Sequence, residues 1–427
     1  MHFSPFSPEN LKSCLRAGDS GKFKVDLLKD RDKICDAASE AAKAKSLSFE
    51  YDTIQLDNGR KIYALTSFHT VLCIRALTKA IKTQFKLHPP NRNYVVRSLI
   101  QSLTDAPPCF IARGDISSFY ESINLDTVLK EIRNSTRTHP DINHMFELLI
   151  KNGIIQEGAL GVPRGIGLST VLAELSLRSF DKQVSNLPDV YRYYRYADDF
   201  IVFATSKHSI SKSKISDLLP DGMSLNTEKS NDNIKLTFST PAKETHPDPT
   251  VFEYLGYRFT AENCIETRAA RTVTVTLSNN KIKKRKTRAI LALRDFQRTR
   301  DGGLLINRIR YLTSNFDIKK HGQTHGRKYK KVRTGIFYNY PACGIYRKGQ
   351  RSDTCTEIRE LKSLDGFLQN LFWSKNSEWS DAVKASLSDA QKRNLRQLSF
   401  NKGFSQKRLV RFTRKQVSEI GKAWKHA

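Results

Sequence analysis

The 427-residue sequence has no hydrophobic segment that could cross a membrane and no pattern of a secretory signal peptide. A spanning helix needs about 20 consecutive apolar residues, and the sequence has no run approaching that length. Both absences argue against membrane insertion and against secretion. The expected location is therefore the cytoplasm.

The sequence also lacks closely spaced cysteines. Its seven cysteines are scattered along the chain, and none forms a C-x-x-C pair with another. An odd number argues against a disulfide framework, and the wide spacing argues against a zinc site. Reduced thiols are expected.

Acidic residues are scarce: 43 Asp and Glu stand against 72 Lys and Arg, which gives a formal charge of +29. Such an excess indicates a polyanionic partner, and nucleic acid is the first candidate. An anionic membrane surface and a merely solvated basic face are the alternatives. Residues 281–334 hold 18 basic and three acidic residues, a net of +15, and residues 391–427 hold 11 basic residues and one acid. Aromatic residues interleave the first of these segments, which favours nucleic-acid contact.

The hydrophobic pattern predicts a chain of mixed helices and strands. Residues 1–50 have a mostly helical pattern. The other helices are expected at 67–85, 94–103, 125–132, 168–184, 207–219 and 281–293. A strand is expected at 110–116, a β-hairpin over 190–204 and a short strand at 252–259, with a glycine-rich loop at 152–167. The length allows two or three domains.

Three aspartates carry the chemistry that the sequence indicates. Asp115 ends the predicted strand in RGDISSFYESI (113–123), and Asp198 and Asp199 lie at the hairpin turn in YRYADDFIVFA (194–204). Magnesium prefers oxygen ligands and is held by one or two carboxylates together with substrate phosphates. Two such ions can clamp the attacking and leaving oxygens of a phosphoryl transfer. Alone, Y-x-D-D occurs by chance in about one chain in thirty of this length and can be an ordinary turn. Here a strand that ends in Asp115, a glycine-rich loop that runs into a helix, and the Y-x-D-D turn follow one another in this order. That order favours nucleotide addition.

These segments together resemble the motifs of reverse transcriptases over about residues 60–300. RGDISSFYESI resembles motif A, GVPRGIGLSTVLAEL (161–175) motif B, YADDF (196–200) motif C, LNTEKS (225–230) motif D and FEYLGY (252–257) motif E. NRNYVVRSLIQSL (91–103) is similar to a basic helix of bacterial members. Within the family, the chain looks most like the bacterial defence or abortive-infection branch. GIFYNYP (335–341) is similar to the single-protein type that works with a non-coding RNA.

The resemblance implies a two-metal site. Asp115 and Asp198 would bind both Mg²⁺ ions, for which Mn²⁺ could substitute, and Ile116 would add its backbone carbonyl. Asp199 would be a weaker ligand or a charge partner, because a turn seldom aims two adjacent side chains alike. Lys229 would protonate the leaving pyrophosphate, although a solvent-exposed lysine is nearly as good an explanation.

It also implies a nucleotide site. Tyr120 would lie under the sugar and exclude a 2′-hydroxyl, while Phe119 would serve mainly in the core. Arg164 stands where glutamine is common in the family, and could bind the incoming phosphates or the template backbone. Glu174 is expected to be the structural partner of an arginine rather than a catalyst. The expected dNTP-binding residues are Phe119, Tyr120, Pro163, Arg164 and Gly165.

Further positions are expected to contact nucleic acid. Tyr254, Leu255 and Gly256 would form a primer-facing hairpin, and 281–293 would be the first helix of a thumb. The expected primer and template contacts are Tyr196, Tyr254, Leu255, Gly256, Lys283, Lys284, Arg285 and Lys286. The expected RNA contacts in the basic tail are Lys407, Arg408, Arg411 and Arg414.

The sequence therefore predicts an α+β right-hand polymerase whose antiparallel palm sheet carries motifs A and C on adjacent strands. The expected domains are fingers with N-terminal helices (1–108), palm (109–262, with the motif B loop and helix at 161–185), basic thumb (263–334) and basic helical extension (335–427). The expected reaction is RNA-directed addition of dNTPs to a 3′-hydroxyl of a DNA product or primer, copying a structured non-coding RNA in bacterial antiphage defence.

Three alternatives stay open at this point. One is a template-independent or protein-primed DNA polymerase of the abortive-infection type. Another is a mobile-intron reverse transcriptase, although the clustered Cys and His of an attached nuclease are missing. The third is a non-catalytic RNA chaperone, against which the three intact aspartates argue.

Overall fold

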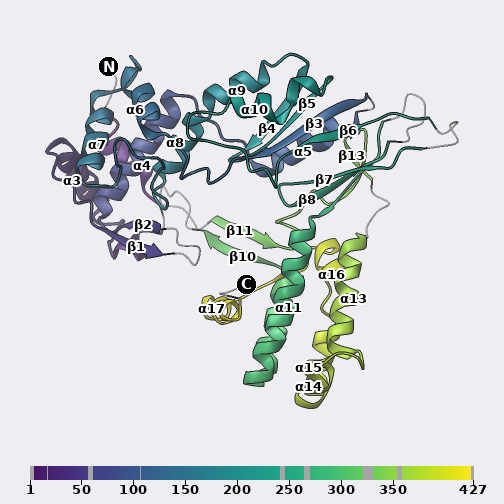
Figure 1. Cartoon of the computed structure of the whole chain (residues 1–427). Coiled ribbons are helices and arrows are strands. Elements are labelled where there is room, and N and C mark those ends of the chain that lie inside the picture. Colours follow the sequence, from purple (N-terminus) through teal and green to yellow (C-terminus); the bar gives the residue numbers. More distant parts are fainter. Residues whose placement is uncertain are drawn as a thin grey trace. The chain divides into compact units, whose positions relative to one another are not determined.

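The computed structural model describes residues 4–16, 18–55, 61–105, 107–240, 246–263, 270–320, 330–352 and 358–424 (Figure 1). The chain divides into two compact units, and each is described by itself. The first unit comprises Met1–Asn91, Cys109–Ile234 and His321–Lys330, and the second comprises Arg92–Pro108, Lys235–Lys320 and Lys331–Ala427. Within the described residues, no helix is long and apolar enough to cross a membrane.

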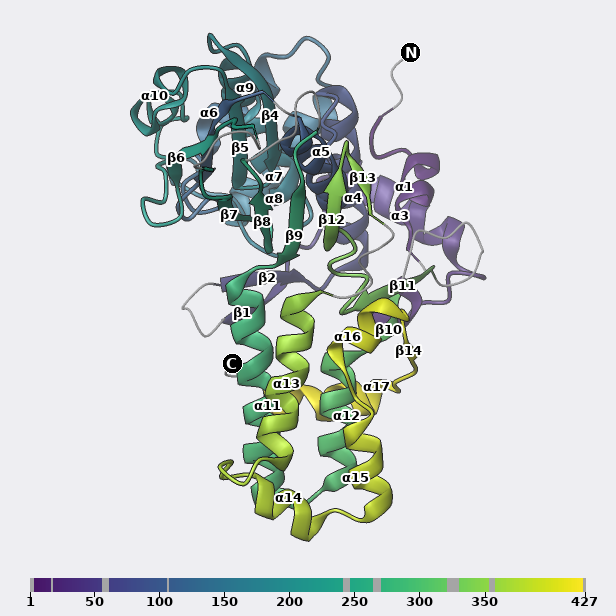
Figure 2. The same cartoon turned by 90° about the vertical axis from the view of Figure 1, so that its right-hand side faces the viewer.

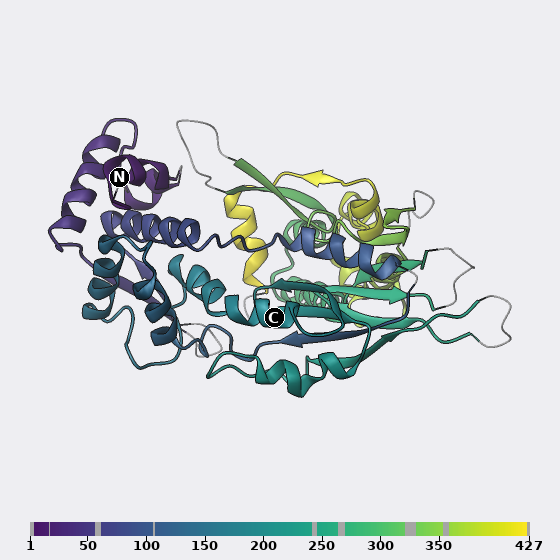
Figure 3. The same ribbon diagram turned by 90° about the horizontal axis from the view of Figure 1, so that it is seen from above.

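Helices make up most of the first unit. They are α1 (Pro8–Cys14), α2 (Asp19–Phe23), α3 (Arg31–Lys43), α4 (Phe68–Gln84), α6 (Leu125–Asn134), α7 (Pro140–Lys151), α8 (Leu168–Ser176), α9 (Arg178–Ser185), the 3-10 helix η1 (His208–Ile210) and α10 (Lys212–Asp217). Helix α4 begins where the Ser67 side chain caps the backbone N–H of Thr70. It buries apolar residues spaced three and four apart, such as Leu72 and Leu77, against α1 and α3. Figure 3 shows α1, α3 and α4, in purple and blue, side by side.

A four-stranded sheet in the order β4-β5-β3-β6 positions the three aspartates. Its strands are β3 (Cys109–Asp115), β4 (Val190–Tyr196), β5 (Asp199–Ala204) and β6 (Asn231–Leu236). A separate hairpin consists of β1 (Tyr51–Gln55) and β2 (Lys61–Leu65). Strands β3 and β5, which carry the predicted motifs A and C, are adjacent and antiparallel, with Asp115 opposite Asp199. Phe200 and Val202 of β5 are buried in the apolar core of the unit.

The second unit combines a five-stranded antiparallel sheet with a bundle of helices. The sheet has the order β13-β12-β9-β8-β7. Its strands are β7 (Thr250–Tyr254), β8 (Tyr257–Ala261), β9 (Val273–Leu277), β12 (Gly344–Arg347) and β13 (Gln350–Arg351). A smaller sheet has the order β11-β10-β14, from β10 (Asn315–Lys320), β11 (Lys330–Gly335) and β14 (Leu409–Val410).

The helices of the second unit are α5 (Arg92–Thr104), α11 (Asn279–Thr299), α12 (Gly302–Thr313), α13 (Arg359–Trp373), α14 (Ser380–Ser386), α15 (Asp389–Arg396), α16 (Phe400–Ser405) and α17 (Arg414–Lys422). Helix α11 packs against α12 and α13, and α12 packs against α15 (Figure 2). Ala292, Leu293 and Phe296 form the buried face of α11. Lys283 and Lys284 of the same helix are exposed.

Most predicted elements are confirmed, as are the mixed α+β class and the antiparallel sheets. The helices expected at 67–85, 94–103, 125–132 and 281–293, the strand at 110–116 and the hairpin over 190–204 are all present. Residues 207–219 are helical only in the short pieces η1 and α10. The region 1–50 contains α1, α2 and α3, as expected.

Two predicted elements were wrong in extent. The helix expected over 168–184 is broken at Leu177 into α8 and α9. The single strand expected over 252–259 is the hairpin β7–β8, which turns at Leu255 and Gly256. Both turn residues have positive φ, 48° and 79°, and an added Cβ at Gly256 would lie 3.1 Å from the Cε atom of Lys281. An alternating apolar pattern fits one bent strand or two short strands equally well, whereas the family resemblance placed a hairpin at Tyr254, Leu255 and Gly256, where the structure has the turn.

Candidate active site

The three aspartates come together at one end of the β3–β5 pair. Asp115 is the last residue of β3 and Asp199 the first of β5, while Asp198 lies in the two-residue loop that joins β4 to β5. Ala197, the first loop residue, has φ of 54°, which is the backbone twist that tight hairpin loops favour. The backbone N–H of Ile116 donates to the carbonyl of Asp198 at 3.2 Å. The loop is thereby fastened to the strand that carries Asp115.

The two adjacent aspartates of the loop have different surroundings. The carboxylate of Asp199 faces Arg113, with Nη2 3.5 Å from Oδ1. Burial raises the pKa of Asp199 to about 6, against the opposing charge of Arg113. Burial also raises the pKa of Asp198, and the neighbouring charge of Asp115 adds to that rise. Asp199 is therefore the charge partner of an arginine, one of the two roles expected for it.

Residues 225–230, the predicted motif D, wrap around Asp115. The N–H of Asn226 donates to the Asp115 carbonyl at 2.8 Å, and the N–H of Asp115 donates to Ser230 Oγ at 3.3 Å. Lys229 Nζ lies 3.0 Å from Asp115 Oδ2. The Asp115 side chain is 7 % exposed, whereas that of Lys229 is 57 % exposed. Lys229 is thus a largely exposed side chain that forms an ion pair with a buried carboxylate.

This arrangement fits a divalent cation at Asp115 and Asp198. Two largely desolvated carboxylates whose charges repel need a positive partner, and the Lys229 ammonium stands in for one at Asp115. Within the described residues, no group of three or more His, Cys, Asp or Glu side chains is close enough to hold a metal. The donor set would therefore be two carboxylates with the Ile116 carbonyl and substrate oxygens. Such a sparse protein donor set is usual for Mg²⁺.

Arg195, which sequence reasoning did not single out, connects the loop to two helices. Its guanidinium binds Glu174 of α8 at 2.8 and 3.2 Å and Asp181 of α9 at 2.7 Å, and it donates to the carbonyl of Ala197 at 3.0 Å. Glu174 is thus the partner of an arginine, as expected. Burial alone would lower the pKa of Arg195, but the hydrogen bonds and charges of Asp181 and Glu174 outweigh it and raise that pKa.

The predicted motif B loop packs against the chain's own backbone. Gly165 has φ of 93°, and an added Cβ would lie 2.4 Å from the carbonyl oxygen of Tyr63, whose N–H donates to the Arg164 carbonyl at 2.8 Å. Only glycine fits there. Pro163 and Arg164 line a cavity of about 400 Å³ together with Tyr63 and Glu121. Gly165 was expected to lie close to a substrate. In the structure it lies close to the backbone of strand β2 instead.

Arg164 and Tyr120 form one assembly. Arg164 makes a bidentate ion pair with Glu121 at 2.7 and 2.9 Å, and its guanidinium lies 4.9 Å from the ring centre of Tyr120. Phe119 is buried at 4 % exposure, as expected for a core residue, while Tyr120 is only partly buried. Glu121 was missed by sequence reasoning, because a lone acid in a loop gives no signal of its own.

The expected primer hairpin and thumb residues lie in the second unit. Tyr254 is fully buried, and the Leu255 carbonyl accepts a hydrogen bond from Arg92 Nε at 3.1 Å. Among the α11 cations, Lys283 and Lys284 are exposed, whereas the Arg285 guanidinium lies 5.1 Å from the Tyr340 ring centre and Lys286 Nζ lies 5.1 Å from that of Phe367. Tyr196, in the first unit, is 37 % exposed.

The four basic residues of the tail are only partly described. Lys407 Nζ lies 4.8 Å from the Phe337 ring centre, and the Arg408 carbonyl accepts from the N–H of Asn315 at 2.9 Å. The side chains of Lys407, Arg408 and Arg411 are exposed. The side chain of Arg414 lies outside the described part of the chain.

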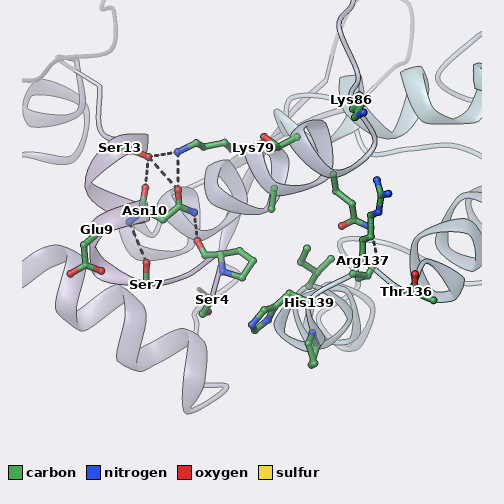
Figure 4. A pocket seen from close by; sticks show the side chains of 17 residues that line it. Ser4, Ser7, Glu9, Asn10, Ser13, Lys79, Lys86, Thr136, Arg137 and His139 are labelled. Atoms are coloured by element: carbon green, nitrogen blue, oxygen red, sulfur yellow. Dashed lines mark hydrogen bonds between the residues drawn. The ribbon is translucent and has the colours of Figure 1, made fainter. Parts of the chain in front are cut away.

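A cavity of about 1060 Å³ in the first unit contains none of the predicted site residues (Figure 4). It lies between α1, the end of α4 and the residues that precede α7. Several of its polar groups bind one another: Lys79 Nζ donates to Asn10 Oδ1 at 2.8 Å and to Ser13 Oγ at 2.7 Å, and Gln84 Nε2 donates to Thr138 Oγ1 at 2.5 Å. Size alone thus does not make it the reactive site.

Curated proteins and the solved structure named below add little to the interpretation of the carboxylate site. No curated protein matches the sequence. One similar solved structure is the telomerase of Candida albicans in complex with a TWJ fragment of telomeric RNA, at 11 % identity and a TM-score of 0.33. The match covers 73 % of this chain but 56 % of the telomerase chain, and so weak a likeness carries no argument.

The family comparison is more specific. Residues 59–259 match the family model described as reverse transcriptase (RNA-dependent DNA polymerase). This stretch includes Asp115, Asp198, the motif B loop and the β7–β8 hairpin. This match indicates a reverse transcriptase domain within the chain.

Proposed function

We propose that the chain adds dNTPs to a 3′-hydroxyl on an RNA template, with Asp115 and Asp198 holding two Mg²⁺ ions. The observation that carries the proposal is the pairing of these two desolvated carboxylates at adjacent strand ends, with a lysine ammonium on one of them. Bound divalent cations would stabilise the charge that develops on the attacking and leaving oxygens. Mn²⁺ would substitute for Mg²⁺.

In this reaction the 3′-oxygen forms a bond to the α-phosphorus, and the bond from that phosphorus to pyrophosphate breaks. Asp115 and Asp198 hold the charge-neutralising cations, with the Ile116 carbonyl as a further donor. Asp199 holds Arg113 and supports the loop from the side. Lys229, exposed and 3.0 Å from Asp115, supplies the proton that leaves with pyrophosphate. Catalysis is mostly positioning and electrostatic stabilisation.

The nucleotide site would be formed by Tyr120 and the motif B loop. Phe119 anchors the segment in the core, and Glu121 and Arg164 hold the Tyr120 ring from its other side. A ring held this way cannot move aside for a 2′-hydroxyl. Arg164 is ion-paired with Glu121 and packs on Tyr120. Its main role would be to hold the Tyr120 ring, and contact with the phosphates would be secondary. Pro163 and Gly165 fix the loop.

The sugar selection is testable. Tyr120→Val should raise the rNTP/dNTP ratio of kcat/KM by about 10-fold or more, since relieving a steric clash is worth about 1–3 kcal/mol. Tyr120→Phe is the matched control, because it keeps the ring and should keep the ratio. Single-nucleotide incorporation with each triphosphate measures both. An unchanged ratio in an active Tyr120→Val variant would remove this residue from sugar selection.

In the right-hand arrangement that we propose, residues 1–108 are fingers, 109–262 palm, 263–334 thumb and 335–427 a C-terminal extension. The turn at Leu255 and Gly256 would face the primer, with Tyr254 buried beneath it and Tyr196 exposed near the carboxylates. Lys283 would contact the primer–template backbone. The side chains of Arg285 and Lys286 pack on aromatic rings, which favours fixed rather than mobile positions for these two cations.

We further propose that the template belongs to a structured non-coding RNA and that the enzyme serves antiphage defence in a bacterial cytoplasm. What supports this is the second cationic segment, 391–427, which a primer–template duplex alone does not require. Lys407, Arg408 and Arg411 present exposed charges there. Sequencing the RNA that copurifies with the protein identifies the template, and a preparation free of any discrete RNA would contradict a dedicated partner.

Charge reversal at Lys407, Arg408, Arg411 and Arg414 should weaken binding of that RNA more than binding of a generic short duplex. If each contacts a phosphate, the log–log salt slope should fall by about 3 to 4 units. Reversal at Lys348, Arg359, Lys375 and Lys384, exposed in the second unit and outside both cationic segments, is the matched control. Filter binding across a salt series measures the slopes. Equal losses of affinity for both nucleic acids would mean that the basic tail binds nucleic acid in general and not one dedicated RNA.

The function itself is tested by primer extension with purified protein, an RNA template, a DNA primer, dNTPs and Mg²⁺. Template-dictated incorporation is expected. Incorporation without a template, or DNA left covalently on the protein after extension, would favour the template-independent or protein-primed alternative. RNA binding without any synthesis would favour the chaperone.

A further inference from the structure

Helix α11 directs four cationic side chains into one small cavity of the second unit. Lys281, Lys284, Arg285 and Arg288 follow the spacing of one helix face, and all four line a cavity of about 250 Å³. Its other walls come from the end of α12, the start of β10 and residues 334–340. None of the described residues that line it is acidic.

These cations lack the counter-charge that a protein normally provides. Throughout the described ranges, none of the four makes an ion pair with a carboxylate, whereas Arg308 of the neighbouring helix α12 is paired with Asp295. Like charges at helical spacing repel one another. Burial lowers the pKa of Arg285, and Arg288 Nε is buried without a hydrogen-bond partner. Together the four groups form an arrangement that an anion would stabilise.

Aromatic packing holds the two arginines in place. The Arg285 guanidinium lies 5.1 Å from the ring centre of Tyr340, and that of Arg288 lies 5.2 Å from that of Trp424. Trp424 Nε1 in turn donates to the Arg288 carbonyl at 3.0 Å. Among the described residues, no carboxylate pairs with either of these guanidinium groups. The two side chains are therefore held in place for a ligand and are not merely solvated.

The size of the cavity restricts that ligand. Small-molecule sites usually have about 300–1,000 Å³, so 250 Å³ suits one phosphate with part of its sugar. A duplex presents its phosphates on a broad convex surface and cannot enter such a hollow. A single strand can, because its backbone is free to turn one phosphate inward.

We propose that this cavity is a phosphate site for single-stranded RNA, distinct from the track that holds the primer–template duplex. The proposal rests on the proposed function, since it assigns a strand of the RNA partner to this site. Lys284 and Arg288, one turn apart, clamp the phosphodiester, and Lys281 and Arg285 complete the positive field. The exposed Lys283 remains on the duplex side.

The test uses the full chain without dNTPs or metal, so that binding is separated from polymerisation. Lys284→Gln/Arg288→Gln is compared with Lys375→Gln/Lys384→Gln, which removes two exposed charges of the same unit away from the cavity. For a 20-nucleotide oligo(U) RNA, the cavity variant should bind roughly 10-fold more weakly at 0.1 M salt, and its log–log salt slope should fall by about 1.4, because each single-strand phosphate contributes about 0.7. Affinity for a blunt RNA–DNA duplex should fall no more than in the control.

A thermal readout separates a binding role from a structural one. Replacing sodium chloride by sodium sulfate should raise the Tm of the wild type more than that of the cavity variant, because the ion binds only the intact site. The cavity variant in chloride should be no less stable than the wild type.

Three results would overturn the proposal. One is an equal loss of affinity for the duplex and for oligo(U), which would mean that these cations bind the primer–template duplex. The second is a loss of oligo(U) affinity equal to that of the control variant. The third is saturable binding of free UMP that disappears in the cavity variant, which would assign the site to a mononucleotide. A wild type that shows the expected oligo(U) behaviour but no primer extension would contradict the proposed function and leave the site standing.

Discussion

Replacing Asp198 by Asn should reduce RNA-templated dNTP incorporation by roughly 10³-fold or more, about 4 kcal/mol of transition-state stabilisation. The amide has the same shape but no charge, so the cation held between Asp115 and residue 198 loses half of its carboxylate charge. Burial and the neighbouring Asp115 already disfavour the charged form of Asp198. Removing its charge therefore should not destabilise the fold.

The measurement is primer extension beside RNA affinity on the same preparation. RNA affinity should stay nearly unchanged, because the two cationic segments are far from Asp198 in sequence and, apart from residues 321–330, belong to the second unit. Asp217→Asn, at an exposed position at the end of α10 in the same unit, is the matched control and should retain full activity. Residual synthesis above a few per cent in Asp198→Asn would rule out this aspartate as a metal ligand.

The backbone around the carboxylates could be predicted because it depends on short-range patterns. Alternating apolar residues with a tight Ala-Asp turn define β4 and β5, and the apolar run before Asp115 defines β3. Order along the chain then indicates that motifs A and C share a sheet. Phe119 as a core residue and Glu174 as an arginine partner followed from the same patterns, and both are confirmed.

What the sequence did not reveal are contacts between segments far apart in the chain. Glu121 meets Arg164 across 43 residues, and Lys229 meets Asp115 across 114. Neither separation has a periodic signature, so no pattern could join them. The break at Leu177 belongs to the same class, since Glu174 and Asp181 reach one guanidinium from the two sides of the break. A continuous helix was the natural prediction from local propensity.

Arg195 is the residue whose loss should damage the first unit most. Its side chain is 7 % exposed and is the shared partner of Glu174 and Asp181. Arg195→Ala would leave the buried carboxylate of Glu174 without its cation, which typically costs about 3–5 kcal/mol. The Tm should therefore fall by roughly 6–20 °C. Arg192→Ala on the same strand, where the arginine is exposed, should change stability by about 0.5 kcal/mol or less.

A conservative replacement distinguishes positioning from stability alone. Lysine keeps the charge of Arg195 but lacks the planar fork that serves two carboxylates and the Ala197 carbonyl together. We therefore expect Arg195→Lys to recover much of the lost Tm while kcat stays depressed and KM for dNTP changes little, because the loop that carries Asp198 has lost its tether. Thermal unfolding and steady-state incorporation on one preparation measure both quantities. If kcat recovers in step with Tm, Arg195 stabilises the unit without aligning Asp198.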